Sequence, residues 1–111
     1  MLDTSPLTAV VERFADRLRA APQSRLARGA AAVALDLARE LAARAQRLEG
    51  GPERELPDAG VFVVGDQLQV AGTDLAQALR EHAAPDGAKA PSVLLDEAVR
   101  LVEQAEVRAM R

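Results

Sequence analysis

The sequence contains no cysteine, no tryptophan and no tyrosine among its 111 residues. The lack of cysteine excludes disulfides, a thiolate nucleophile and any metal site that uses cysteine ligands. Phe14 and Phe62 are the only aromatic residues, so aliphatic side chains and close backbone approach must fill the core. No apolar run approaches the roughly 18–20 residues of a membrane span, and the N-terminus does not resemble a signal peptide. We therefore expect a cytoplasmic protein without membrane contact.

Residues that carry enzyme chemistry are also scarce. His82 is the only histidine, which excludes a metal site built on a histidine pair, and we expect it to bond carbonyl groups at a helix end. The only serines, Ser5, Ser24 and Ser92, each precede a helical pattern and are interpreted as N-caps. No GxSxG, GxGxxG or GxxxxGK[ST] motif is present. We expect no enzyme activity, no catalytic residue, no cofactor and no metal.

The composition is that of one globular domain spanning residues 1–111. Hydrophobic residues make up 49% of the chain and charged residues 28%, far from the composition of disordered chains. The net charge of −3 is unevenly spread, because residues 1–51 hold more basic than acidic side chains and residues 52–111 the reverse. We divide the domain into a helical half (5–49), a loop rich in Gly and Pro (50–60), and a mixed half (61–111).

Apolar residues recur at helical spacing in four segments, which predict helices over 6–21, 24–49, 74–84 and 92–109. Pro6 suits the first turn of a helix, and Pro22 ends the first segment. Thr73 is predicted to cap the third helix at its N-terminus. A loop is predicted over residues 85–87, which follow that helix. The 24–49 helix carries two apolar stripes, so we expect it to be covered on two sides.

Residues 61–70 carry a pattern typical of a β-hairpin. Val61 to Val64 and Gln67 to Val70 flank the dipeptide Gly65-Asp66, which suits a two-residue hairpin turn. The predicted fold is therefore α+β and dominated by helix, with the order α-α-β-β-α-α. Because an isolated hairpin is marginally stable, we expect a four-stranded antiparallel sheet formed across a dimer.

The leading functional hypothesis is a small, non-enzymatic interaction or regulatory module that forms a homodimer and contacts a further, unidentified protein. Two surfaces motivate it: the outer face of the hairpin, and the small-residue stripe of the 24–49 helix, which would let another helix approach closely. The candidate interface residues are Phe62, Val64, Ala31, Leu35, Ala38, Ala42 and Arg44.

Arg44 interrupts an apolar stripe and has two interpretations. Its guanidinium extends to solvent or pairs with Glu40 one turn earlier. Alternatively, it contacts an acidic group of a partner at a dimer interface.

The alternative functional hypothesis is a DNA-binding regulator with a winged-helix-like arrangement. It is motivated by an arginine cluster around the first inter-helix corner, made of Arg13, Arg17, Arg19, Arg25 and Arg28. The predicted hairpin, however, has no basic residue to meet phosphates, and the acidic second half would repel them. We therefore do not expect nucleic acid to be the partner.

Overall fold

The computed structural model describes residues 2–52, 54–82 and 90–111. They form α1 (Ser5–Ala20), α2 (Gln23–Arg25), the π-helical turn η1 (Leu26–Ala30), α3 (Ala31–Glu49), α4 (Val64–Glu81) and α5 (Pro91–Ala109). None of these described residues lies in a β-strand. The predicted α+β fold, its hairpin and its four-stranded sheet are therefore wrong, and the protein is an all-helical bundle.

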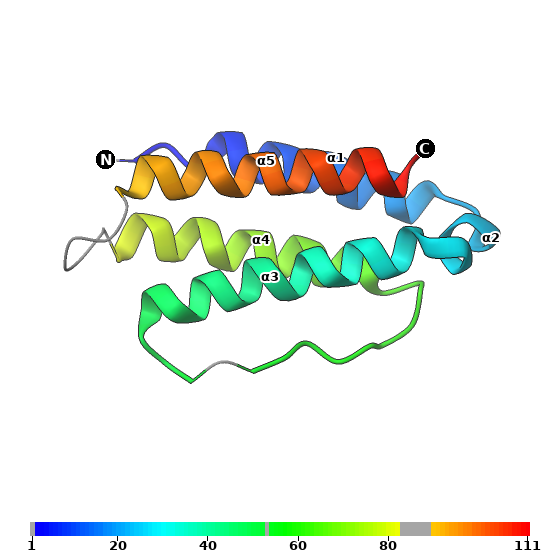
Figure 1. The fold of residues 1–111 in the computed structure, drawn as a ribbon, viewed down its shortest axis with the longest axis horizontal. Helices are drawn as coiled ribbons and strands as arrows, with labels where there is room; N and C mark the ends of the chain where they lie inside the picture. Colours follow the sequence, from blue (N-terminus) through cyan, green and yellow to red (C-terminus); the bar gives the residue numbers. More distant parts are fainter. Residues whose placement is uncertain (1, 53, 83–89) are drawn as a thin grey trace.

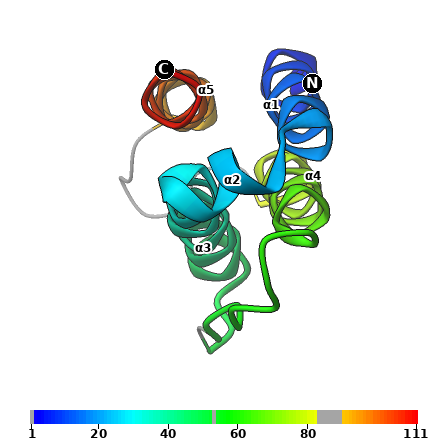
Figure 2. The same cartoon turned by 90° about the vertical axis from the view of Figure 1, so that its right-hand side faces the viewer.

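The four long helices lie at the corners of a quadrilateral when the bundle is viewed end-on (Figure 2). Helices α1 and α5 run in one direction, and α3 and α4 run in the opposite direction (Figure 1). Two consecutive helices with the same direction need a long crossover connection. The chain between α3 and α4 supplies it by returning in an extended path along α3 (Figure 1).

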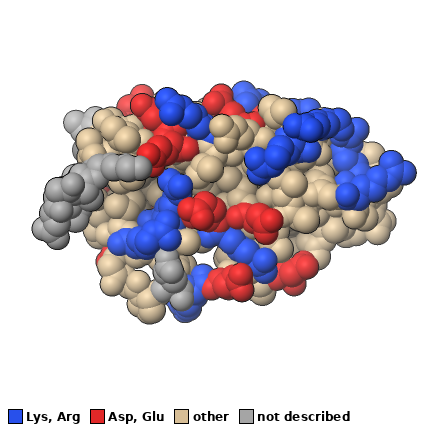
Figure 3. All heavy atoms as spheres, viewed as in Figure 1, with Lys and Arg blue, Asp and Glu red and all other residues tan. Residues whose placement is uncertain are grey.

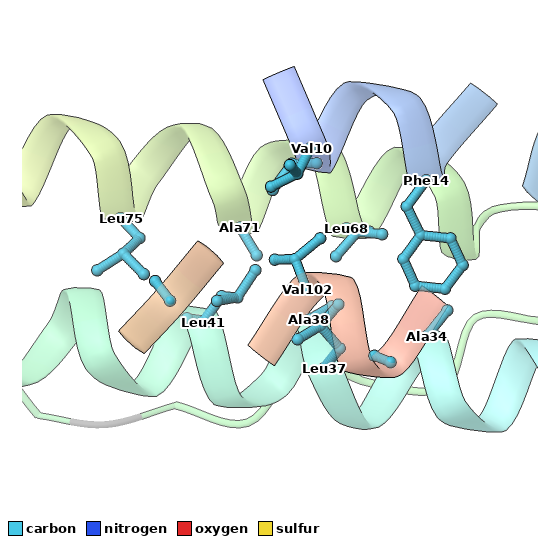
Figure 4. Packing of buried hydrophobic residues seen from close by; sticks show 14 of the residues in the cluster. Val10, Phe14, Ala34, Leu37, Ala38, Leu41, Leu68, Ala71, Leu75 and Val102 are labelled. Carbon is cyan, nitrogen blue, oxygen red and sulfur yellow. The ribbon is translucent and has the colours of Figure 1, made fainter. Parts of the chain in front are cut away.

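The core is built almost entirely from Leu, Val and Ala, as the scarcity of aromatics predicted. Phe14 of α1 is fully buried and is the one aromatic side chain in it. Three residues of α3 face three residues of α4: Leu37, Ala38 and Leu41 on one helix, and Leu68, Ala71 and Leu75 on the other (Figure 4). Val102 of α5 lies in front of these two helices in the same view. Alanine lets the helix backbones come close together, which replaces the bulk that aromatic residues would supply.

The segment predicted to be a hairpin forms a turn and the first two turns of α4. Its buried residues follow helical rather than alternating spacing, and the same spacing continues through the predicted cap Thr73: Val64, Leu68, Ala71, Leu75 and Leu79. Helix α4 therefore buries one unbroken stripe against α1 and α3. The four residues on each side of Gly65-Asp66 form a pattern that is too short to outweigh this longer periodicity.

The predicted 24–49 rod is divided at Gly29. This residue has φ 150°, outside the helical region, and a glycine adopts such a conformation with less strain than other residues. The kink lies within η1 and separates α2 from α3, so the prediction of one continuous helix over 24–49 is wrong. An isolated glycine in a helical pattern was the available signal for it.

The predicted caps also differ from the observed ones. The N-cap residues of α1, α2 and α5 are Thr4, Pro22 and Ala90, not the serines that follow them. At α1 the first backbone N–H is instead satisfied by the Asp3 carboxylate, which accepts from Ser5 N at 2.9 Å. This hydrogen bond holds the pKa of Asp3 below its usual range. The predicted loop 85–87 lies outside the described residues.

We expect Gly72→Ala to lower the free energy of unfolding by about 1–3 kcal/mol, because it overpacks the contact between α1 and α4. A Cβ atom at Gly72 would lie 2.7 Å from both methyl carbons of Val11, and a β-branched side chain has few alternative rotamers to relieve the clash. Chemical denaturation measures the effect. The double variant Gly72→Ala/Val11→Ala should recover part of the loss, and a stabilised single variant would show that this close contact does not exist.

Candidate functional site

The seven candidate interface residues have different environments in the structure. Val64, Leu35, Ala38 and Ala42 are buried within one chain, and Ala31 is half-buried. The small-residue stripe of α3 is therefore already covered, chiefly by α4. Phe62 differs from all of these, since 72% of its surface is exposed.

A groove of about 360 Å³ lies at the end of the bundle beside the Gly29 kink, and we call it the kink groove. It brings together three of the candidate residues, Ala31, Leu35 and Val64, and Val61, the neighbour of Phe62, lines it too. The remaining candidates Phe62, Ala38, Ala42 and Arg44 do not line it. The full lining comprises Leu26, Ala27, Gly29, Ala31, Ala32, Leu35, Asp36, Arg39, Asp58, Gly60, Val61, Val64 and Gln67.

One wall of the kink groove is formed by residues 58–61, which precede α4, and side chains of the flanking helices hold this part of the chain in place. Arg39 Nε donates to the Leu56 carbonyl at 2.8 Å, and Gln67 Nε2 donates to the Pro57 carbonyl at 2.9 Å. Farther along α3, the Gln46 amide exchanges two hydrogen bonds with the backbone of Arg54. The extended segment is therefore bonded to the bundle along its length, which gives the groove a defined wall.

Phe62 lies in the turn between that wall and α4. The turn is closed by Val63 N donating to the Gly60 carbonyl at 3.3 Å, and Gly60 N in turn donates to Asp58 Oδ1 at 3.0 Å. The next side chain, Val64, is buried and anchors the turn to the core. Phe62 is thus held outward by an ordered turn, next to a groove lined in part by apolar side chains. The sequence pointed to Phe62 but not to the groove, because the lining joins two stretches that are distant in the chain, 26–39 and 58–67.

Arg44 is engaged within the chain. Its Nε donates to Glu40 Oε2 at 2.8 Å, and its Nη1 lies 3.5 Å from Glu97 Oε1 of α5. The guanidinium therefore links α3 to α5 while its stem packs along the helix surface. Of the two interpretations, pairing with Glu40 is the one seen here.

Three arginines of the predicted basic cluster have structural partners. Arg13 and Arg17 of α1 lie 2.8 and 3.2 Å from the Glu106 carboxylate of α5. Arg19 lies 2.7 Å from Asp66, which joins α1 to the start of α4. These contacts fix the packing of α1 against its two neighbours.

Glu106 is the one buried acidic side chain among the described residues. Burial by itself raises the pKa of its carboxyl, but hydrogen bonds from Arg13 and Arg17 outweigh that effect, so its pKa is lowered from the ordinary 4.5. The carboxylate is thus ionised and paired at neutral pH.

Within the described ranges, no group of three or more His, Asp or Glu side chains has the geometry to hold a metal ion. His82 is the C-cap residue of α4, where its backbone N–H donates to the Ala78 carbonyl at 2.8 Å. No helix in the described part of the chain is both long and apolar enough to cross a bilayer. The predicted hairpin at residues 61–70 would have been the wing of a winged-helix arrangement, but these residues form a turn and part of α4.

The chain was compared with protein-family models, with curated proteins and with solved structures, and none of them matches it.

Proposed function

We propose that the protein is a small, non-enzymatic interaction module that acts in the cytoplasm as a homodimer, with Phe62 and the kink groove as its contact surface. The observation that carries this proposal is the placement of Phe62. One of two aromatic side chains in the chain is 72% exposed on an ordered turn, beside a groove that it does not fill. Buried aromatic anchors in pockets are the residues that most often dominate the energy of protein interfaces.

The occupant that we propose for the groove is Phe62 of a second copy. A twofold dimer requires a self-complementary surface, in which residue i meets residue j and j meets i. Phe62 and the groove adjoin each other on one protomer, so a single twofold axis can bring each Phe62 to the partner's groove. A cavity of about 150 Å³ can hold a benzene ring, and the kink groove, at about 360 Å³, has room for a phenyl group.

Sedimentation equilibrium at micromolar concentrations tests the proposal. We expect wild-type protein to form a dimer and Phe62→Ser to weaken dimerisation by roughly 30-fold or more, the equivalent of one interface hot spot. Ala32 lines the groove and is exposed, so Ala32→Arg should block the same contact from the other side.

The matched control is Val107→Ser on α5, which removes an apolar side chain that is 62% exposed and does not line the groove. It should dimerise as the wild type does. A wild-type protein that stays monomeric up to about 100 µM, or a Phe62→Ser variant that dimerises normally, would rule out this contact surface; the concentration corresponds to a free energy of association weaker than about 5.5 kcal/mol.

A further inference from the structure

A second hollow lies at the same end of the bundle, and we call it the arginine hollow. It has a volume of about 390 Å³ and is lined by Arg25 and Arg28 of the kink region and by Arg108 and Arg111 at the end of α5. No Asp or Glu contributes to its lining. Basic side chains gather at this end of the molecule, at the upper right of Figure 3. The protein as a whole is acidic, so this concentration of positive charge is local.

These four arginines lack the Asp and Glu partners that others in the chain have. In residues 2–52, 54–82 and 90–111, no ion pair joins any of them to an acidic side chain, whereas Arg13, Arg17 and Arg19 are all paired. The sequence explains why. The positions three and four residues before Arg108 are Ala105 and Gln104, which offer no carboxylate on its side of the helix.

The four guanidinium groups are arranged as two pairs. Arg25 and Arg28 are three residues apart in the kink region, whereas Arg108 lies in the last turn of α5 and Arg111 lies two residues beyond its end. The two segments are linked where Arg25 Nη1 donates to the main-chain oxygen of Arg111, the last residue of the sequence, at 3.0 Å. Like charges at this spacing repel one another, and the repulsion lowers the stability of the unliganded protein. A bound anion would remove that repulsion.

We propose that the arginine hollow binds an anion with two or more phosphate groups. The guanidinium fork matches the oxygen geometry of a phosphate and can donate two parallel hydrogen bonds to it. Two arginine pairs from two different segments line one hollow, and four guanidinium groups suit two linked phosphates better than a single carboxylate. The hydroxyl-bearing Ser24 also lines the hollow and adds a neutral donor. The inference does not rest on the proposed dimer, because none of the four arginines lines the kink groove.

Thermal unfolding with inorganic pyrophosphate as the probe tests this inference. At constant ionic strength, saturating pyrophosphate should raise the Tm by about 5 °C or more, and calorimetric titration should show a saturable site. Arg28→Gln/Arg108→Gln should weaken binding at least tenfold, roughly the value of one charged hydrogen bond. The same variant should have a higher Tm than wild type without ligand, because like-charge repulsion is relieved.

The matched control is Arg54→Gln/Arg100→Gln, which changes the net charge equally at two exposed positions that do not line the hollow. It should bind pyrophosphate as the wild type does, and so should Phe62→Ser. A nucleoside diphosphate that binds more tightly than pyrophosphate identifies a nucleotide as the source of the phosphates, and equal affinity identifies the free anion. A Tm rise matched by sulfate at equal ionic strength, or binding of duplex DNA that pyrophosphate does not displace, would overturn the proposal.

Discussion

Leu68→Ala is expected to lower the free energy of unfolding by about 2–5 kcal/mol, the usual cost of removing a fully buried leucine side chain. Leu68 is 0% exposed in the centre of α4, where it packs among side chains of α1 and α3 (Figure 4). Alanine would leave a cavity between three helices, which the rigid helix backbones cannot close completely. Chemical denaturation monitored by circular dichroism measures the loss.

The matched control for this prediction is Val70→Ala. Val70 lies two residues further along α4 and is 60% exposed, so its truncation should change the free energy of unfolding by less than about 0.5 kcal/mol. In the β-hairpin register suggested by the local pattern, Leu68 and Val70 would share one face and both truncations would be costly. Similar losses in the two variants would therefore contradict the helix.

Arg13→Met/Arg17→Met is expected to destabilise the protein by about 3–5 kcal/mol near pH 7, because it leaves a buried carboxylate without a partner. The Glu106 side chain is only 6% exposed, whereas those of Arg13 and Arg17 are 55% and 50% exposed. Water therefore hydrates the two guanidinium groups but hardly reaches the Glu106 carboxylate. Denaturant titration of the variant at several pH values measures the effect.

Removing the charge of Glu106, instead of the two arginines, should lower the free energy of unfolding by less. Glu106→Gln leaves two arginines that can still be hydrated, so we expect a loss of about 1–2 kcal/mol. Arg13→Met/Arg17→Met/Glu106→Met removes the whole cluster and should be close to wild type in stability, because an apolar replacement of a buried ion pair is often neutral or better. A triple variant as unstable as the double variant would show that packing, not the unpaired charge, causes the loss.

The pH dependence of the double variant follows from the opposing effects on Glu106. In the wild type its pKa is below 4.5, so its stabilising contribution is present above that pH and is lost as the pH falls through the lowered pKa. Without the arginines, burial alone raises the pKa, and protonation then removes the unpaired charge. The stability difference between wild type and double variant should therefore shrink between about pH 7 and pH 4.

Much of the helical content could be predicted from the sequence. The helical spacing of apolar residues over 6–21 predicted α1, and the residues of that stripe, Leu7, Val10, Val11, Phe14 and Leu18, are all buried. Helix α5 was found from the same kind of stripe. Both helices have a proline in the first turn and a clear apolar period, so local pattern and tertiary packing agree.

The error at residues 61–70 arose because two periodicities overlap there. The hairpin pattern considered only the residues around Gly65-Asp66, whereas burial of Leu68 also depends on the apolar positions of α1 and α3 that meet it. Two glycines of α4 were misinterpreted for the same reason. Gly65 was interpreted as part of a hairpin turn, and Gly72 lay between the predicted hairpin and the predicted third helix, but both are buried in α4 at its close approach to α1. Local sequence cannot distinguish these two uses of glycine.

The candidate site was predictable only in part. Phe62 was identifiable because it is one of two aromatic residues and was placed on the outer, uncovered face of the predicted hairpin. The kink groove depends on the relative placement of η1, α3, residues 58–61 and the start of α4. The arginine hollow likewise joins Arg25 and Arg28 to the distant Arg108 and Arg111. Such meetings of segments far apart in the chain are set by the tertiary fold.

Residues 64–81 form one continuous helix, and the exposure of Phe62 and the shape of the kink groove both depend on it. Backbone chemical shifts measured by NMR test it directly. We predict helical carbon shifts at every position from Val64 to Glu81, with strong contacts between successive amide protons. Extended shifts over 67–70, together with cross-strand contacts between Val63 and Leu68, would contradict the bundle described above.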